Sequence, residues 1–151
     1  MTQWLMAEPL VRFEDSISER PILNACSGKY VFGDVTTDAF SPAMVKGDVR
    51  HLPFRNDSFA AVFADVPWKN DWMRNVSSAI REMLRVAPVA YMMSPWTYGG
   101  RGVRMDRIWV CWKPGVTQAL LLVRYVRGEE YAELARKRID MNHRPLEEFR
   151  E

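Results

Sequence analysis

Short apolar runs that each stop at a carboxylate or a glycine constrain most strongly what this chain can fold into. A run of roughly four to eight apolar residues between turn signals is typical of a strand that is buried on both faces of a parallel sheet. The runs, with the residues that stop them, are Ile22–Cys26 before Ser27-Gly28, Tyr30–Thr37 before Asp38, Ala43–Lys46 before Gly47-Asp48, and Ser58–Asp65. We therefore expect a sheet with carboxylates at its strand ends.

One amphipathic helix is predicted after the last of these runs. Asn70 or Asp71 is a suitable N-cap, and Pro88 stops the pattern. The apolar residues between them recur at the spacing of one helical face; they are Trp72, Met73, Val76, Ile80, Met83, Leu84 and Ala87. A further strand over Val89–Met93 and a glycine-containing loop over Thr97–Gly102 follow.

Two strand-like runs near the end of the chain predict an antiparallel hairpin. They are Arg107–Trp112 and Thr117–Tyr125, and Lys113-Pro114-Gly115 between them is a turn signal. The order of strands, helix, strand and hairpin predicts an α/β fold with a mixed, mostly parallel sheet and a C-terminal antiparallel hairpin. Ligands of such sheets bind outside the carboxyl ends of the strands.

Length and composition bound the organisation of the chain. The 151 residues predict a single domain over residues 1–151, with a core over about residues 21–127 and a polar, helical C-terminal end. The net charge of +2 is far from the excess of a nucleic-acid-coating protein. Cys26 and Cys111 lack metal-ligand spacing, so no metal is expected. With neither a long apolar run nor a signal-peptide pattern, we expect a cytoplasmic protein without a membrane partner.

Three segments stand out beyond the strand pattern, namely Ile22–Gly28, Gly47–Phe54 and Ser58–Trp68. Together they resemble successive motifs of S-adenosylmethionine-dependent methyltransferases. Asp65-Val66-Pro67-Trp68 is similar to the D-P-P-W tetrapeptide of family members that methylate amino groups of nucleobases, particularly adenine N6. The resemblance implies a Rossmann-like methyltransferase sheet, S-adenosyl-L-methionine as cofactor, and DNA or RNA as substrate.

The resemblance assigns one group of residues to the cofactor. Asp38 would hold the ribose hydroxyls, and Asp48 would hold the adenine amino group. Ser27 and Gly28 would present backbone N–H groups to the carboxylate of the methyl donor. The full set expected to bind the cofactor is Asn24, Ser27, Gly28, Asp38, Asp48 and Val49.

The residues expected to carry catalysis are Asp65, Val66, Pro67 and Trp68. An exocyclic amine is a poor nucleophile because its lone pair is delocalised into the ring, so its N–H groups need acceptors. The Asp65 carboxylate and the Val66 carbonyl would accept them, and Pro67 would restrict the backbone between the two contacts and Trp68. Trp68 would stack on a flipped or unpaired base. Trp96, which follows another predicted strand, suits a pocket wall and a packing role equally well.

Two departures from the family pattern bear on activity. The close spacing of Ile22–Cys26 and Asp38 leaves no room for a normal helix between them, so the first crossover is abbreviated. Val66 stands where the family has its first proline. Two alternatives therefore stay open: methyl transfer to another acceptor, and a non-catalytic cofactor-binding or interaction subunit.

Several further expectations concern partners and reactivity. Arg101 and Arg104 belong to or follow a loop at a strand end, so we expect them to contact the phosphates of a bound strand. A homo-oligomer or a separate specificity partner is left open. Neither cysteine follows a proline, as the nucleophile of cytosine C5 methylation does, so Cys26 is expected to be a core residue.

Overall fold

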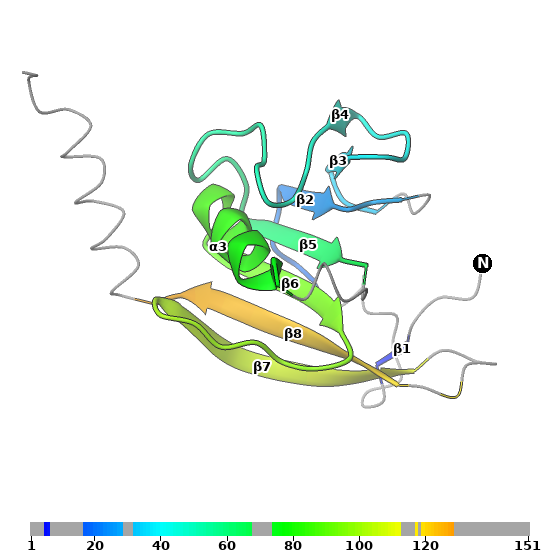
Figure 1. The fold of residues 1–151 in the computed structure, drawn as a ribbon, viewed down its shortest axis with the longest axis vertical. Helices are drawn as coiled ribbons and strands as arrows, with labels where there is room; N and C mark the ends of the chain where they lie inside the picture. Colours follow the sequence, from blue (N-terminus) through cyan, green and yellow to red (C-terminus); the bar gives the residue numbers. More distant parts are fainter. Residues whose placement is uncertain are drawn as a thin grey trace, which may run out of the picture.

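A computed structural model shows one eight-stranded sheet with the strand order β1-β7-β8-β6-β5-β2-β3-β4 (Figure 1). It describes residues 5–6, 17–28, 32–67, 74–112, 117 and 119–128. The strands are β1 (Leu5–Met6), β2 (Ile22–Ala25), β3 (Val35–Asp38), β4 (Val45–Lys46), β5 (Ala61–Asp65), β6 (Val89–Ser94), β7 (Val103–Trp112) and β8 (Leu120–Arg127). Among the described residues, α3 (Val76–Val86) is the one helix.

Five strands form the parallel body of the sheet, in the order β4-β3-β2-β5-β6. The central strands β2, β5 and β6 are buried along nearly their whole length, and this is why the sequence shows them as unbroken apolar runs. The strand order reverses between β2 and β5. In doubly wound sheets this reversal opens the crevice at the carboxyl ends of the strands where ligands bind.

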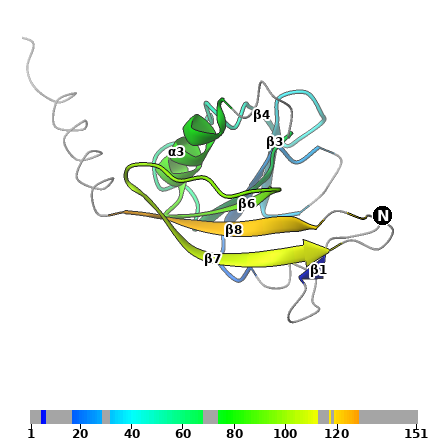
Figure 2. The same cartoon turned by 60° about the horizontal axis from the view of Figure 1, so that its bottom comes forward.

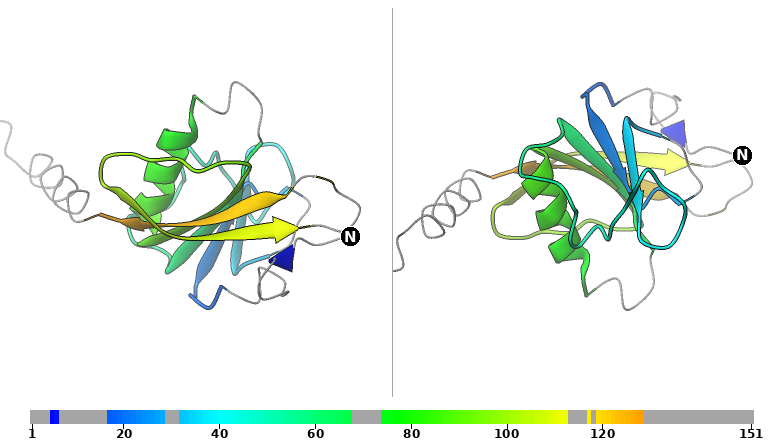
Figure 3. Two further views of the ribbon diagram at one scale, coloured as in Figure 1. Left: turned by 90° about the horizontal axis from the view of Figure 1, so that it is seen from below. Right: turned by 90° about the horizontal axis from the view of Figure 1, so that it is seen from above.

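The C-terminal hairpin is antiparallel, as predicted, and its first strand begins earlier than expected. Val103 pairs with Arg127 at one end of the hairpin, and Cys111 pairs with Leu120 at the other. β8 also pairs antiparallel with β6, so it lies between β6 and β7, and β7 runs in the direction of β6. The strands β7 and β8 cross the direction of β2 and β3 at a steep angle (Figure 3), as the twist of a large sheet requires.

Helix α3 covers one face of the sheet (Figure 2). Its buried residues are Val76, Ala79, Ile80, Met83, Leu84 and Val86, which confirms the predicted apolar stripe over these turns. The expected start was too early, because Arg74 and Asn75 form a turn and the helix begins only at Val76. The expected caps Asn70 and Asp71 lie outside the described residues. The predicted end is confirmed, since the C-cap Ala87 is followed by Pro88.

The connection between β2 and β3 is abbreviated, as predicted. It comprises the nine residues 26–34, fewer than the dozen or so that a helical crossover needs. Its described parts, 26–28 and 32–34, contain no helix. β3 begins at Val35 rather than at the expected Tyr30, because Gly33 has a φ of 90° and turns the chain against the backbone of β2.

Candidate functional site

The carboxyl ends of the parallel strands bring several predicted site residues into one row. Ala25 of β2 pairs on one side with the residue before Asp38 and on the other with the residue before Asp65. The residues that follow Ala25 and its two partners therefore lie side by side at the carboxyl ends of their strands. From β4 to β6 these residues are Lys46, Asp38, Cys26, Asp65 and Met93, and we term them the carboxyl-edge row.

Asp38 is buried, and its carboxylate holds two loops in place. One oxygen accepts hydrogen bonds from the backbone N–H groups of Phe40 (2.8 Å) and Ser41 (2.7 Å), and the other accepts one from Gly28 (2.8 Å). Burial by itself raises the pKa of Asp38, but these three N–H donors and the charge of Lys46 hold that pKa below its ordinary value. Asp38 is therefore ionised at neutral pH and bonded to its own chain.

The turn after β2 uses its N–H groups inside the chain. Ser27 donates its backbone N–H to the carbonyl of Thr37 (3.1 Å), and Gly28 donates to Asp38. Cys26 and Gly28 adopt left-handed φ values of 63° and 55°. A residue other than glycine in this conformation marks a backbone that its surroundings constrain. The expected contact of Ser27 and Gly28 with a donor carboxylate stays a prediction, and it requires these N–H groups to change or share their partners.

Cys26 lies at the centre of the negative charges of the site. Burial raises the pKa of its thiol to about 12, and the charges of Asp38, Asp48 and Asp65 contribute in the same direction. A thiol with this pKa is protonated at neutral pH and is not a nucleophile, which agrees with the sequence-based exclusion of cysteine chemistry. Cys26 is partly buried and packs against the core on the α3 face, which agrees with its expected place in the core. The charges of three carboxylates therefore act on one small, neutral side chain.

Asp48 follows β4 and forms an ion pair with Arg50. The Nε group of Arg50 donates to the two carboxylate oxygens at 2.9 and 3.0 Å, Nη2 donates to one of them, and the Arg50 backbone N–H donates at 2.8 Å. The side-chain hydrogen bond from Arg50 is the main reason that the pKa of Asp48 is below its ordinary value. A cofactor amino group at Asp48 would share this carboxylate with Arg50.

Gly47 allows the backbone before Asp48 to approach β3 closely. A Cβ atom at Gly47 would lie 2.8 Å from Thr37 Oγ1 and 2.8 Å from Pro53 Cδ, which is closer than real Cβ contacts come. The fully buried Thr37 therefore leaves room only for glycine here. The sequence Gly47-Asp48 thus meets a packing requirement at Gly47 and places a carboxylate at Asp48.

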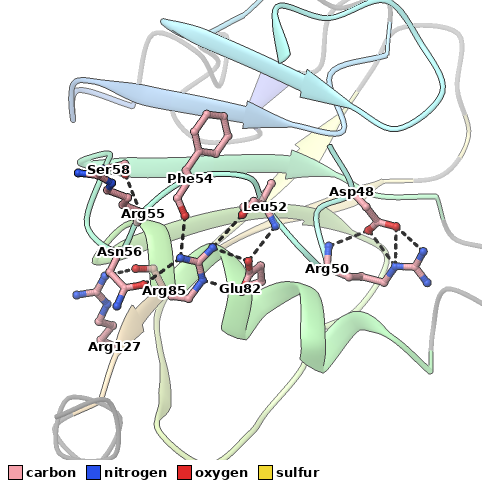
Figure 4. A network of polar contacts seen from close by, with 10 residues as sticks. All are labelled: Asp48, Arg50, Leu52, Phe54, Arg55, Asn56, Ser58, Glu82, Arg85 and Arg127. Atoms are coloured by element: carbon pink, nitrogen blue, oxygen red, sulfur yellow. Dashed lines mark hydrogen bonds and ion pairs between the residues drawn. The ribbon is translucent and has the colours of Figure 1, made fainter. Parts of the chain in front are cut away.

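The segment after Asp48 is fastened to α3 by Glu82 and Arg85 (Figure 4). Arg85 donates to the carbonyl groups of Leu52 (3.0 Å) and Phe54 (2.8 Å), while Glu82 accepts the N–H of Leu52 at 2.9 Å. Glu82 and Arg85 also form an ion pair with each other, and we term the two the loop clamp. Because Leu52 is held at both its N–H and its C=O, the clamp fixes the position of the turn that carries Asp48.

The loop clamp and Arg50 are the residues that sequence reasoning missed. Glu82 and Arg85 are three residues apart on a helix, which in a sequence is typical of a solvated surface pair. Arg50 lies inside the segment Gly47–Phe54 that carries the family resemblance, but that resemblance concerned Asp48. No local signal indicates that these side chains reach backbone groups about 30 positions away in the chain, as Glu82 and Arg85 do.

The end of β5 carries the described part of the expected catalytic tetrapeptide. Asp65 and Pro67 are exposed, whereas Val66 is 3% exposed and packs in the core on the α3 face. Val66 therefore anchors the segment while its neighbours face solvent. Trp68 lies outside the described residues, so its stacking role stays a prediction.

Two residues expected to bind the cofactor lie in the interior. Asn24 is in the middle of β2 and is 1% exposed, and Val49 is 1% exposed in the core on the α3 face. Their side chains do not reach the surface at the carboxyl edge. The family resemblance gave their positions along the chain, but the packing around β2 and α3 decided which way they point.

The loop between β6 and β7 begins at the carboxyl edge but ends at the opposite edge of the sheet (Figure 1). Val103 begins β7, and its partner Arg127 ends β8 beside the beginning of β6. Arg101 and Arg104 therefore lie about the length of β6 away from Asp65, on the order of 20 Å for a strand of this length. The structure thus places the two arginines at the edge of the sheet opposite Asp65, and their expected contact with the phosphates of a bound strand stays a prediction.

Two absences hold for the part of the chain that the structure describes. Its His, Cys, Asp and Glu side chains form no group of three or more that could hold a metal ion. Its one helix is also too short and too polar to cross a membrane.

No family model and no curated protein matches the sequence. Solved structures do resemble the fold. One comes from a study of the conversion of a disulfide bond into a thioacetal group during echinomycin biosynthesis; it matches with a TM-score of 0.51 and 12% identity over 87% of this chain and 86% of that one. TrmN from Thermus thermophilus matches with a TM-score of 0.45 and 13% identity over 70% of this chain and 43% of that one. A Thermotoga maritima protein described as a SAM-dependent methyltransferase, possible histamine N-methyltransferase, matches with a TM-score of 0.47 and 12% identity over 74% and 83%.

The first of these likenesses extends over most of both chains. The predicted arrangement is confirmed by the strand pairings: the chain has a Rossmann-like sheet that is mostly parallel, ends in an antiparallel hairpin and has an abbreviated first crossover. At 12% identity the likeness shows the fold, and the function has to be argued from the site itself.

Proposed function

We propose that this chain is an S-adenosyl-L-methionine-dependent methyltransferase that acts on an exocyclic amino group of a nucleobase, with adenine N6 in DNA or RNA as the leading target. The observation that carries the proposal is that Asp38, Cys26 and Asp65 follow the ends of neighbouring strands at the strand-order reversal, with Asp48 close enough for its charge to act on Cys26. These three carboxylates were expected from the sequence to serve donor and acceptor. Their meeting at the position where such sheets bind ligands supports that division.

The donor side fits the cofactor chemically. S-adenosyl-L-methionine supplies an electrophilic methyl group on a positively charged sulfonium, together with ribose hydroxyls and an adenine amino group. Asp38 and Asp48 are ionised acceptors that suit hydroxyl and amino donors, and the negative field around Cys26 suits the sulfonium. Ser27 and Gly28 would bind the carboxylate end of the cofactor after exchanging their present partners.

The acceptor side is the exposed end of β5. Asp65 would accept a hydrogen bond from the amino group of the base, and the backbone carbonyl of Val66 would accept a second one. With both N–H bonds held by acceptors, the lone pair of the amino nitrogen would be less delocalised into the ring and would be available to displace the methyl group from the sulfonium. The sulfur would keep the electrons of the broken C–S bond as S-adenosylhomocysteine, and the surplus proton of the methylated nitrogen would pass to the Asp65 carboxylate or through it to water. The buried side chain of Val66 keeps these two acceptors in fixed relation, as Pro67 does through its restricted backbone.

A second candidate function is a non-catalytic subunit that binds the cofactor or a partner. One observation favours it: the N–H groups of Ser27 and Gly28 and the carboxylates of Asp38 and Asp48 all bond within the chain. A donor site whose groups are engaged in this way binds more weakly, because each new contact replaces an existing one.

Calorimetric titration with S-adenosylhomocysteine, followed by methyl-transfer assays, separates these candidates. Transfer of labelled methyl groups from S-adenosyl-L-methionine is measured on single- and double-stranded DNA and RNA, and N6-methyladenine is identified in the digested product. We expect binding and methylated adenine. Binding without transfer to any nucleic acid favours the second candidate, and the absence of binding overturns both.

A further inference from the structure

Trp96 is an exposed aromatic residue whose backbone is fixed. Trp96 is 37% exposed, although it lies only two residues beyond the end of the buried strand β6. The Trp96 N–H donates to the hydroxyl of Ser94 (3.1 Å), and the same hydroxyl donates to the Trp96 carbonyl. Ser94 is 1% exposed, so these bonds attach Trp96 to the interior of the sheet.

The neighbour of Trp96 is held in the same way. The ring of Tyr98 lies 6.2 Å from that of Trp96, and the two planes are inclined by 57°. Tyr98 donates its backbone N–H to the hydroxyl of the fully buried Tyr125 (3.0 Å) and packs against the core on the α3 face. Trp96 therefore packs near Tyr98, and an exposed aromatic residue on a fixed backbone can receive a flat ligand.

The register places the end of β6, which leads to Trp96, beside the proposed acceptor residues. β6 is the strand next to β5, and Met93 pairs with Asp65. Trp96 follows Met93 by three residues beyond the same edge of the sheet. The cations that the sequence suggested for phosphate contacts, Arg101 and Arg104, lie at the opposite edge. An exposed aromatic residue therefore follows the strand that neighbours Asp65, whereas Arg101 and Arg104 lie at the opposite edge of the sheet.

We infer that Trp96 is a stacking residue of the acceptor site and that the site takes an unpaired nucleobase chiefly through stacking. This inference rests on the proposed function and narrows its substrate to single-stranded or flipped-out bases. Stacking on an indole needs an exposed π-face, which a base inside a duplex does not offer. Because this recognition uses little phosphate contact, its dependence on salt is shallow.

Trp112 offers a matched control for Trp96. It is 45% exposed and ends β7, which β8 separates from β6. The two tryptophans are thus similar in chemistry and exposure, but Trp112 is two strands, about 10 Å, farther from β5 than β6 is. Loss of general apolar surface affects both substitutions alike, whereas loss of a specific stacking partner affects only Trp96.

The test uses a fluorescent single-stranded oligoadenylate and an abasic strand of equal length. Their binding is measured for the unaltered full chain and for the variants Trp96→Ala, Trp96→Phe and Trp112→Ala. We expect Trp96→Ala to weaken oligoadenylate binding by roughly five- to hundredfold, the loss typical of one base stacked on an aromatic ring. Trp96→Phe retains most of the affinity, and Trp112→Ala binds like the unaltered chain. Abasic-strand binding and S-adenosylhomocysteine affinity stay unchanged in all variants.

The inference is overturned if the unaltered chain does not bind oligoadenylate, if Trp96→Ala binds it normally, or if Trp112→Ala loses as much affinity. A steep salt dependence of oligoadenylate binding also contradicts it. Failure of the proposed function has a different signature. In that case the unaltered chain does not bind S-adenosylhomocysteine, and this result does not depend on any change at Trp96.

Discussion

The two halves of the carboxyl edge differ in how their polar groups are used. On the β3 and β4 side, Asp38 and Asp48 accept hydrogen bonds from backbone N–H groups and from Arg50. On the β5 and β6 side, Asp65, Pro67 and Trp96 are exposed to solvent. The first half is organised by contacts within the chain, and the second presents its side chains outward.

The difference has a physical cause in the loops that follow the strands. β3 and β4 are short and lead into tight turns, whose backbone N–H groups need acceptors when they are buried. The carboxylates at the strand ends supply these acceptors and in doing so hold the turns. We therefore expect substitutions in the β3 and β4 half to change cofactor binding and stability, and substitutions in the β5 and β6 half to change acceptor binding and turnover.

Asp65→Ala is expected to have the largest effect. Removal of one fixed hydrogen-bond partner of a reacting group costs about 10²- to 10³-fold in kcat. S-adenosylhomocysteine affinity, measured by calorimetry, stays nearly intact because Asp65 belongs to the acceptor half. If the variant folds normally but no longer binds S-adenosylhomocysteine, the division of the edge into two halves is wrong. Asp57→Ala, at an exposed turn before β5, is the control.

Asp48→Ala tests the donor half. The loss of one charge-assisted hydrogen bond costs about 1.5–3 kcal/mol, or roughly ten- to hundredfold in affinity for S-adenosylhomocysteine. The substitution also leaves Arg50 without its carboxylate, so Asp48→Asn is measured beside it to separate charge from hydrogen bonding. An unchanged titration for both variants would remove Asp48 from the cofactor site.

Arg85→Ala tests whether the loop clamp organises the donor half from a distance. The change leaves the carbonyl groups of Leu52 and Phe54 and the partly buried Glu82 without their charged donor, so we expect a loss of about 1–3 kcal/mol in the free energy of unfolding by urea. S-adenosylhomocysteine affinity falls several-fold, whereas kcat at saturating cofactor is unchanged. Ser78→Ala, at an exposed position on the same helix, is the control and changes neither quantity.

Cys26→Ser is expected to have the smallest effect on activity, although Cys26 lies between the halves. Its thiol has a pKa raised from 9.0 to about 12, so at neutral pH it is protonated in the folded and unfolded chain alike. Between about pH 9 and 12 the unfolded chain loses this proton and the folded chain keeps it, so stability falls as the pH rises. In urea unfolding experiments across this pH range, the free energy of unfolding of Cys26→Ser therefore falls less than that of the unaltered chain. A variant that loses methyl transfer while keeping its fold contradicts the assignment of Cys26 as chemically inert.

The sequence determined the elements of this fold because their signals are local. Unbroken apolar runs indicated β2, β5 and β6, and the spacing of apolar residues from Val76 to Ala87 indicated most of α3. A turn signal between two β-rich runs indicated the hairpin, and carboxylates at the ends of runs indicated the edge where a ligand binds. Each of these patterns lies within a few consecutive residues and reflects burial or backbone conformation at that place.

Only the tertiary structure decided which residues at the carboxyl edge bond to one another. Gly28 donates a hydrogen bond to Asp38, and Arg85 donates one to the carbonyl of Leu52. No pattern in the sequence relates the two residues of either pair. The return of the loop after β6 to the far edge, which moves Arg101 away from Asp65, follows from the insertion of β8 between β6 and β7. Strand register and long-range hydrogen bonds arise from the simultaneous packing of all strands and α3, so no local stretch of sequence contains them.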